Sequence, residues 1–152
     1  MENLNLDVNE KILYQEGISF TGNSIEEKWY DCYLTNYNLI LYKKTKKLFG
    51  APKIDLVKLP LGKFSLVDGE PFYHVFDDDY GYGIMLIYEK EIIKLTFEDE
   101  PEDDYYLNKA RVFGNQICDA ISKIVVKFKV CSNCGAKIGK DMSFCKECGA
   151  EV

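Results

Sequence analysis

The chain has 152 residues, enough for one compact domain and one small additional module, which excludes a large multidomain enzyme. Hydrophobic residues make up 47% of the chain and charged residues 29%, a balance typical of a folded protein rather than a disordered one. The formal net charge of −6 supplies no general attraction to nucleic acid or to an anionic membrane, so any such binding has to be local.

The N-terminal residues bear on the cellular compartment. Met1–Leu4 contains no basic residue, no apolar run of signal-peptide length follows, and no stretch approaches the ~18 apolar residues of a membrane-spanning helix. We therefore expect a cytoplasmic protein without a transmembrane segment. Thiols stay reduced in that compartment, so clustered cysteines indicate a metal site before a disulfide.

The first 97 residues have the pattern of strands and turns. Short apolar runs alternate with polar residues and are separated by Gly, Pro, Asn and Asp. We expect hairpin turns at Thr35–Asn38, where Asn tolerates a positive φ, and at Glu89–Lys90. The seven expected strands are Glu10–Glu16, Glu27–Thr35, Asn38–Lys44, Lys53–Leu59, Lys63–Val67, Tyr82–Tyr88 and Glu91–Phe97.

The pattern changes after Phe97. Residues 98–104 contain one proline and six carboxylates, which favour a helix N-terminus through its dipole and its unpaired amides. Apolar residues then recur at alternating steps of four and three, which predicts an amphipathic helix that runs to about residue 125 and covers a sheet. This stripe consists of Tyr106, Ala110, Phe113, Ile117, Ala120 and Ile124.

Seven strands followed by one helix resemble the pleckstrin-homology-like fold, in which a helix closes one end of a bent-sheet barrel. The segment Tyr33–Tyr42 is similar to the second hairpin of GRAM-type and bacterial pleckstrin-homology domains, and Glu10–Tyr14 is similar to their first strand. We therefore expect a mainly β fold with one C-terminal α-helix. A generic antiparallel barrel or sandwich with a terminal helix is the alternative.

This resemblance implies binding, either of phosphoinositide head groups or of protein segments. The lipid-binding members place basic residues in the loops after their first and third strands. The first of these loops, expected at residues 17–27, contains two acids and no base, and so departs from the pattern. The second is rich in lysine and is a candidate site for an anionic ligand, although a solvated basic loop is the simpler explanation. Its lysines are Lys43, Lys44, Lys46, Lys47 and Lys53.

The C-terminal residues contain a duplicated cysteine turn. Cys131–Ile138 parallels Cys145–Val152 at an offset of 14, with a glycine after each cysteine pair. Two cysteines separated by two residues can direct both thiolates at one ion, and the glycine supplies the unusual φ of this turn. Two such turns offer four thiolates in a tetrahedron, the closed geometry of structural Zn²⁺, with rubredoxin-type iron as the alternative metal. The expected zinc ligands are Cys131, Cys134, Cys145 and Cys148.

The cysteine module resembles the short zinc ribbons found at the ends of many bacterial and archaeal proteins, over about residues 129–152. Its few apolar residues cannot stabilise a fold of this size alone, so metal binding has to supply the stability. The core candidates are Ile138, Met142, Phe144 and Val152. We expect a pleckstrin-homology-like domain at residues 1–126 and a zinc-ribbon domain at residues 127–152, closely joined.

The remaining chemistry-bearing residues are expected to be structural. Asp77–Asp79 lacks the ligand spacing of a calcium loop, so we expect a solvated turn there. His74 is the only histidine and is expected to be a packed or surface loop residue. Cys32, in a strand, and Cys118, in a helix, are expected to act as small apolar residues. The chain contains no phosphate loop, nucleophile elbow or metal-catalytic motif, so no catalytic residue is identified.

These patterns favour a non-enzymatic cytosolic binding or scaffold protein, in which the pleckstrin-homology-like domain engages a protein partner and the ribbon is structural. The alternative is binding to an anionic lipid or membrane surface through the lysine-rich loop 43–53. A second alternative is nucleic-acid binding by the ribbon with nearby lysines. The zero net charge of residues 131–152 and the −9 of residues 1–122 oppose nucleic acid as a partner. Those lysines are Lys123, Lys127, Lys129, Lys137, Lys140 and Lys146.

Overall fold

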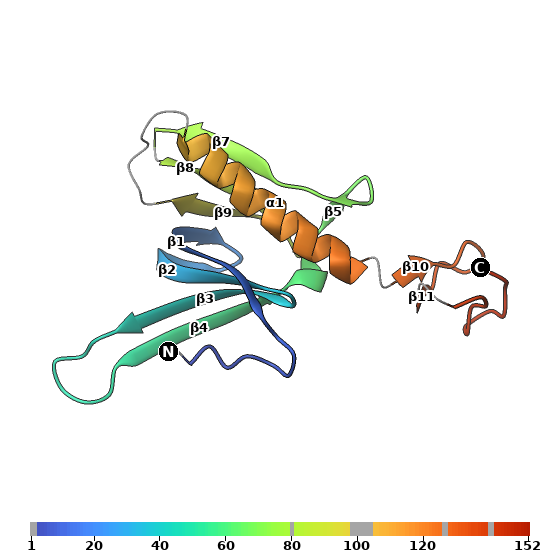
Figure 1. Cartoon of the computed structure of the whole chain (residues 1–152), viewed down its shortest axis with the longest axis horizontal. Coiled ribbons are helices and arrows are strands. Elements are labelled where there is room, and N and C mark those ends of the chain that lie inside the picture. The colour runs from blue at the N-terminus through green and yellow to red at the C-terminus, as the bar shows by residue number, and fades with distance from the viewer. Residues whose placement is uncertain (1–2, 80, 98–104, 126–127, 140–141) are drawn as a thin grey trace.

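One antiparallel sheet of seven strands, in the order β4-β3-β2-β1-β9-β8-β7, forms the body of the protein. The computed structural model describes residues 3–79, 81–97, 105–125, 128–139 and 142–152. The sheet bends, and α1 lies against β1, β7 and β8 and against the 3₁₀ turn that follows β4 (Figure 1). The elements of this part of the chain are β1 (Ile12–Gly22), β2 (Ile25–Thr35), β3 (Asn38–Thr45), β4 (Lys53–Pro60), the 3₁₀ turn Leu61–Lys63, β5 (Leu66–Val67), β6 (Glu70–Pro71), β7 (His74–Asp78), β8 (Gly81–Tyr88), β9 (Glu91–Phe97) and α1 (Tyr105–Val125).

Two tight hairpins set the register of the sheet. The turn between β1 and β2 consists of Asn23 and Ser24, whose φ angles are 51° and 56°. The turn between β8 and β9 consists of Glu89 and Lys90, with φ angles of 48° and 72°. Two successive positive φ angles match the right-handed twist of the strands that they join. The expected hairpin at Glu89–Lys90 is therefore confirmed.

The turn between β2 and β3 is stabilised differently from the sequence expectation. Its Asn36 does not adopt a positive φ. Instead, the Thr35 hydroxyl accepts hydrogen bonds from the backbone N–H groups of Tyr37 (3.1 Å) and Asn38 (2.8 Å). The same hydroxyl donates to the Glu10 carboxylate at 2.6 Å. The sequence analysis expected an Asn with a positive φ to form this turn. The Thr35 side chain stabilises it instead, through hydrogen bonds to the turn backbone.

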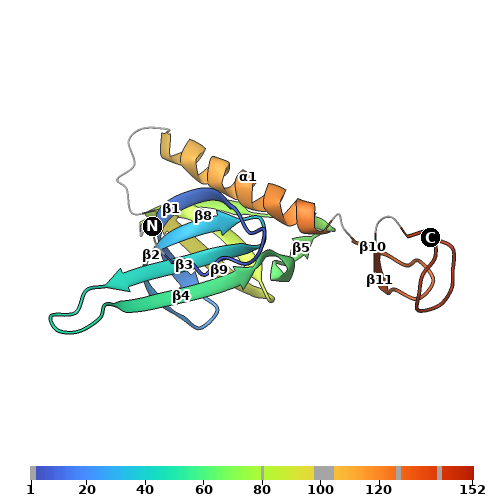
Figure 2. The same cartoon turned by 60° about the horizontal axis from the view of Figure 1, so that its bottom comes forward.

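The core lies between the concave face of the sheet and α1, and Figure 2 shows the helix crossing the bent sheet. The predicted helix stripe is confirmed at Ala110, Phe113, Ile117 and Ala120, which are buried, while the Tyr106 side chain lies outside the described residues. The Phe113 ring stacks on that of Tyr14 at a centroid distance of 5.1 Å. The expected helix start at residues 98–104 also lies outside the described residues.

The strand expectations were wrong in three places. The first strand does not end at Glu16 but continues to Gly22, so most of residues 17–27 are strand rather than loop. Lys63–Val67 is not a strand of the main sheet, because Leu61–Lys63 forms a 3₁₀ turn that buries Leu61, and Leu66–Val67 pairs only with β6 among the described residues. The seventh strand is instead β7, at His74–Asp78, which the sequence analysis read as loop and turn.

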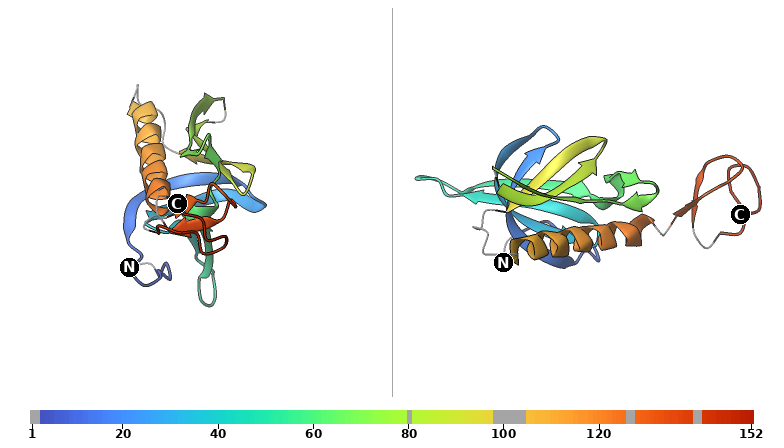
Figure 3. Two further views of the ribbon diagram at one scale, coloured as in Figure 1. Left: turned by 90° about the vertical axis from the view of Figure 1, so that its right-hand side faces the viewer. Right: turned by 90° about the horizontal axis from the view of Figure 1, so that it is seen from above.

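Taken together, the antiparallel strands and the helix that follows them confirm the expected mainly β fold class with one C-terminal α-helix among the described residues. After α1, the chain enters a separate two-stranded sheet, β10 (Phe128–Val130) with β11 (Lys137–Gly139). Figure 3 shows this sheet at the C-terminal end of the chain. The boundary at residues 126 and 127 lies outside the described residues and remains a prediction.

The buried Glu10 carboxylate leads to a testable pH dependence. Burial acts to raise its pKa, but hydrogen bonds from Thr35, Asn38 and the Asp7 backbone, with the charge of Lys58, outweigh burial and lower the pKa below the ordinary value of 4.5. Because the folded pKa is the lower one, the stabilisation by ionised Glu10 is fully present above pH 4.5 and is lost as the pH falls through the folded value.

We therefore expect the free energy of unfolding to fall in acid, and the decline to be shallower in Glu10→Gln than in the parent. Glu10→Ala, which leaves two buried donors without their acceptor, should cost about 1–3 kcal/mol at neutral pH. Urea unfolding between about pH 3 and 7 measures both effects. Parallel pH profiles for the parent and Glu10→Gln would contradict this assignment.

Candidate metal centre

The sequence duplication at the C-terminus is also a structural duplication. In each turn the N–H of the first cysteine donates to the carbonyl of the alanine five residues later, at 2.8 Å. The glycine N–H donates back to the carbonyl of that cysteine, at 2.8–2.9 Å. Gly135 and Gly149 both have a φ of 74°, the left-handed conformation that the turn requires and that glycine adopts without strain. The two cysteine pairs are therefore presented by equivalent backbones.

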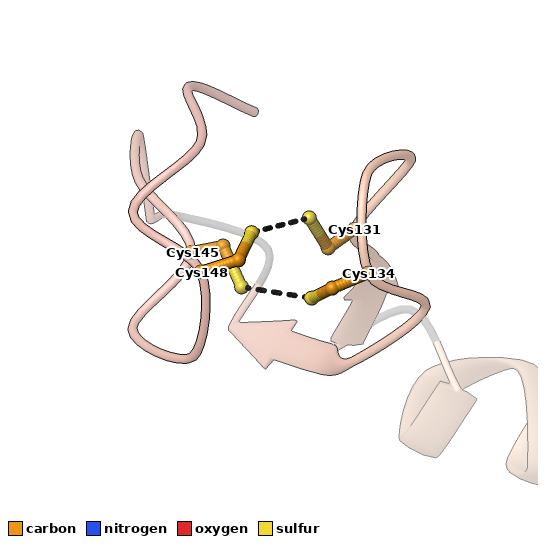
Figure 4. A group of neighbouring side chains, drawn as sticks. All are labelled: Cys131, Cys134, Cys145 and Cys148. Atoms are coloured by element: carbon orange, nitrogen blue, oxygen red, sulfur yellow. Dashed lines mark hydrogen bonds between the residues drawn. The ribbon is translucent and has the colours of Figure 1, made fainter.

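The four sulfur atoms converge from these two turns, as Figure 4 shows. The Sγ atoms of Cys131 and Cys148 are 3.7 Å apart, those of Cys134 and Cys145 are 3.5 Å apart, and all four lie within 4.8 Å of one another. A tetrahedral zinc site with Zn–S bonds of about 2.3 Å has sulfur–sulfur edges of about 3.8 Å. A disulfide would need about 2.05 Å. The donor set therefore fits one tetrahedral zinc ion and does not fit a disulfide pair.

Burial alternates within each cysteine pair. Cys131 and Cys145 are buried, whereas Cys134 and Cys148 are exposed. The exposed sulfurs receive hydrogen bonds from backbone amides, Cys134 from Ala136 and Cys148 from Ala150. A hydrogen bond from Asn133, followed by that from Ala150, lowers the pKa of Cys148 to about 6. Such N–H···S bonds stabilise thiolates, which are the form that binds metal.

The small core of the ribbon is built around the cysteines themselves. Ile138 is buried between Cys131 and Cys145, and Val152 packs against this cluster. Phe144, which the sequence analysis placed in the core, is 60% exposed, so that expectation was wrong. With so little apolar burial, a bound metal ion is the main source of stability available to this module.

A zinc-ribbon family model matches residues 130–152. This match covers the whole duplicated cysteine module and agrees with its sulfur geometry. The C-terminal module is a zinc ribbon with a four-cysteine metal site, consistent with one structural zinc ion. No curated protein sequence matches the chain.

Solved structures resemble the chain at low sequence identity. The hSac2 domain from the human phosphoinositide phosphatase Sac2 matches with 12% identity and a TM-score of 0.52, over 80% of this chain and 76% of that one. Two structures of the Vav1 exchange factor, one described through its PH and C1 domains, match with 15% and 14% identity and TM-scores of 0.44 and 0.45. The chain spans 39% and 38% of their lengths. The likeness to the hSac2 domain concerns the fold alone.

The predicted lysine cluster comes together at the end of one hairpin. Lys43 and Lys44 end β3, Lys46 and Lys47 lie in the following turn, and Lys53 begins β4. The other loop considered for head-group binding is not a loop, because β1 and β2 meet there in a two-residue turn. The basic residues therefore belong to a single projecting element rather than to two converging loops.

Most of the other residues that the sequence analysis considered for a chemical role lie in strands or in the helix. His74 is exposed on β7, Asp77 and Asp78 belong to the same strand, and Asp79 follows it as a turn, so only Asp79 fits the expected solvated turn. Burial raises the pKa of the Cys32 thiol and raises that of Cys118 to about 11, as expected for packing residues. No helix among the described residues has the length and apolarity needed to cross a membrane.

The sequence analysis missed an apolar groove of about 130 Å³ on the outer face of the sheet. We call it the β7–β9 groove, and it is formed by apolar side chains on the outer face of these strands. Met85 and Ile87 point outward between buried neighbours of β8, and Ile92 does so on β9. Apolar residues on both faces of Tyr82–Tyr88 were the available signal. The groove is lined by Phe72, His74, Met85, Leu86, Ile87 and Ile92.

The metal centre predicts a selective response to chelation. The purified chain should contain about one zinc per molecule, and a strong chelator should unfold residues 128–152 while the seven-stranded sheet stays folded, because metal binding contributes ~10–16 kcal/mol in comparable peptides. Metal analysis and the amide NMR spectrum before and after chelation measure the two effects. A content far below one metal per chain, with iron and nickel also absent, would contradict the assignment.

Proposed function

We propose that this chain is a non-enzymatic adaptor whose pleckstrin-homology-like domain binds a segment of a partner protein and whose zinc ribbon is a structural module. The observation that carries the proposal is the β7–β9 groove beside β7, the last strand of the sheet in the described part of the chain. Its lining is almost entirely apolar, and Ile92 at its rim is 64% exposed. Such a surface suits the anchoring of an apolar side chain.

The edge strand β7 supplies the second element of this binding surface. It is the last strand of the sheet order and pairs with β8 on one side. An edge strand leaves a row of backbone N–H and C=O groups that an extended segment can pair with. A partner segment lying along β7 could thus form a further strand while one of its side chains enters the groove.

The charge around the groove limits what the partner can be. Residues 66–97, which include β7, β8 and β9, contain seven acidic and two basic residues. The acidic balance of the segment that carries the groove favours a partner that combines basic residues with a large apolar one. The proposed partner is therefore a basic, apolar-anchored protein segment rather than an acidic one or a nucleic acid.

In this proposal the four ribbon cysteines are the zinc ligands, and their role is structural. Four thiolates fill the tetrahedral coordination of zinc and leave no position for substrate or water. When bound, the ion would supply folding energy to the ribbon. The backbone amides of Ala136 and Ala150 would donate hydrogen bonds to the exposed sulfurs. The ion would be held by Cys131, Cys134, Cys145 and Cys148.

A peptide selection tests the groove. The zinc-loaded chain is screened against a library of extended peptides, and the enriched peptides should combine basic residues with one large apolar residue. Ile92→Glu should lower the affinity for them at least about tenfold, because it places a charge in the apolar site. Val8→Glu is the matched control, since Val8 is an exposed apolar residue that does not line the groove.

Amide NMR shifts with an enriched peptide should concentrate on β7, β8 and β9. Enrichment of acidic peptides, equal losses of affinity in both variants, or shifts confined to another part of the sheet would each overturn the proposal. Circular dichroism melting of both variants separates a loss of binding from a loss of fold.

A further inference from the structure

The β3–β4 hairpin ends in a segment that projects from the sheet. Its backbone pairs without interruption from Asn38 with Pro60 to Thr45 with Lys53, so residues 46–52 are carried by a regular two-stranded ribbon. Figures 1 and 3 show this end of the hairpin pointing away from β7, β8 and β9. We call residues 43–53 the hairpin tip.

The apex of the hairpin tip is apolar. Leu48 and Phe49 are adjacent in sequence and are 93% and 86% exposed. Two neighbouring large apolar side chains that lie almost entirely in water contribute nothing to the core of their own chain. Their position at a projecting end indicates a surface that contacts another molecule.

The hairpin tip and the segment that carries the β7–β9 groove have opposite charges. The tip contains five lysines and no acid, whereas residues 66–97 contain seven acids and two bases, so their net charges are +5 and −5. Lys53 forms an ion pair with Asp55 at 3.3 Å, and the other four lysines form none among the described residues. Most of the positive charge of the tip is therefore available to an acidic surface.

Exposed carboxylates lie next to residues that line the groove. Glu91 directly precedes Ile92, and Glu70 lies two residues before Phe72. Both carboxylates belong to exposed residues, and neither forms an ion pair within the described part of the chain. The groove thus combines an apolar lining with acidic groups that can pair with lysine.

We propose that the hairpin tip of one copy of this chain docks in the β7–β9 groove of a second copy, with Phe49 as the anchor and Lys46 and Lys47 facing the neighbouring carboxylates. The groove volume of about 130 Å³ is close to that of an apolar cavity of about 150 Å³ that holds benzene, so it suits one aromatic ring. This inference rests on the proposed function, because it names the partner segment of the same groove. The tip has both features expected of that segment, basic residues and a large apolar one.

The geometry makes this contact head-to-tail. The tip belongs to the β4 end of the strand order and the groove to the β7 end, and the tip points away from the groove of its own chain. Each docked pair therefore leaves one tip and one groove open, so that association continues beyond a dimer unless a ring closes. A single apex buries less surface than a stable interface, so we expect a weak, reversible association in the micromolar-to-millimolar range.

Complementation between two variants tests this contact. Phe49→Glu removes the anchor and keeps the groove, and Ile92→Glu blocks the groove and keeps the tip; both residues are exposed in the single chain. Sedimentation velocity of the zinc-loaded parent, from about 10 μM to about 1 mM, should show association beyond a dimer. Each variant alone should associate at least about tenfold more weakly, because it brings a charge into the apolar contact. An equimolar mixture should form a 1:1 complex that grows no further, since it contains one competent tip and one competent groove.

The matched control is Val8→Glu, the same type of substitution at an exposed apolar residue outside the tip and the groove, and it should associate like the parent. Raising NaCl from about 50 to about 500 mM should weaken the association of the parent several-fold, because the paired charges are exposed and screened by salt. Circular dichroism melting of every variant confirms that the fold is retained.

Four results would each overturn the inference: a parent that stays monomeric up to about 1 mM, variants that associate like the parent, a mixture no more associated than its components, or association that is insensitive to salt. The proposed function is tested separately by the peptide selection. Enriched peptides that bind the groove of a monomeric parent would support the proposed function and overturn self-docking alone. The absence of both self-association and enriched peptides would overturn both.

Discussion

The double pairing of β1 is the constraint on which the rest of the fold depends. Its residues 18–20 pair with β2 on one side and with β9 on the other, so this strand joins the two halves of the sheet. Ile18 and Phe20, among these residues, are fully buried. The same strand holds the helix through Tyr14, which stacks on Phe113, and Glu16, which forms an ion pair with Lys109 at 3.0 Å. Sheet closure and helix docking are therefore coupled.

That arrangement places the two end strands of the sheet farthest from β1 in the strand order. β4 and β7 are the two ends of the sheet in the described part of the chain. The lysine-rich end of the β3–β4 hairpin belongs to the β4 end, and the β7–β9 groove belongs to the β7 end. Ends of a sheet are free of packing constraints that the central strands must satisfy, so they can hold exposed apolar residues without disturbing the core.

The ribbon is stabilised by a different interaction from the domain that precedes it. The domain buries a continuous apolar cluster of strands and helix, whereas the ribbon core consists of two cysteines and one isoleucine. The first is stabilised mainly by the removal of apolar surface from water, and the second depends on metal–sulfur bonds. The two modules of the chain therefore respond to different conditions. The stability of the domain depends on pH through the Glu10 carboxylate, and that of the ribbon depends on the availability of metal.

The sequence by itself determined the features that depend on local spacing. The duplicated Cys-X2-Cys-Gly turn predicted four neighbouring sulfurs, the steps of four and three predicted the buried face of α1, and alternation predicted β9 at Glu91–Phe97. Only the tertiary structure decided the features that depend on long-range pairing. The extension of β1 toward Gly22 is paired with β9, which lies 73 to 79 residues away along the chain, and no local pattern contains such a partner. The exposure of Leu48 and Phe49 was decided in the same way, because an apolar pair reads as core until the fold shows that nothing covers it.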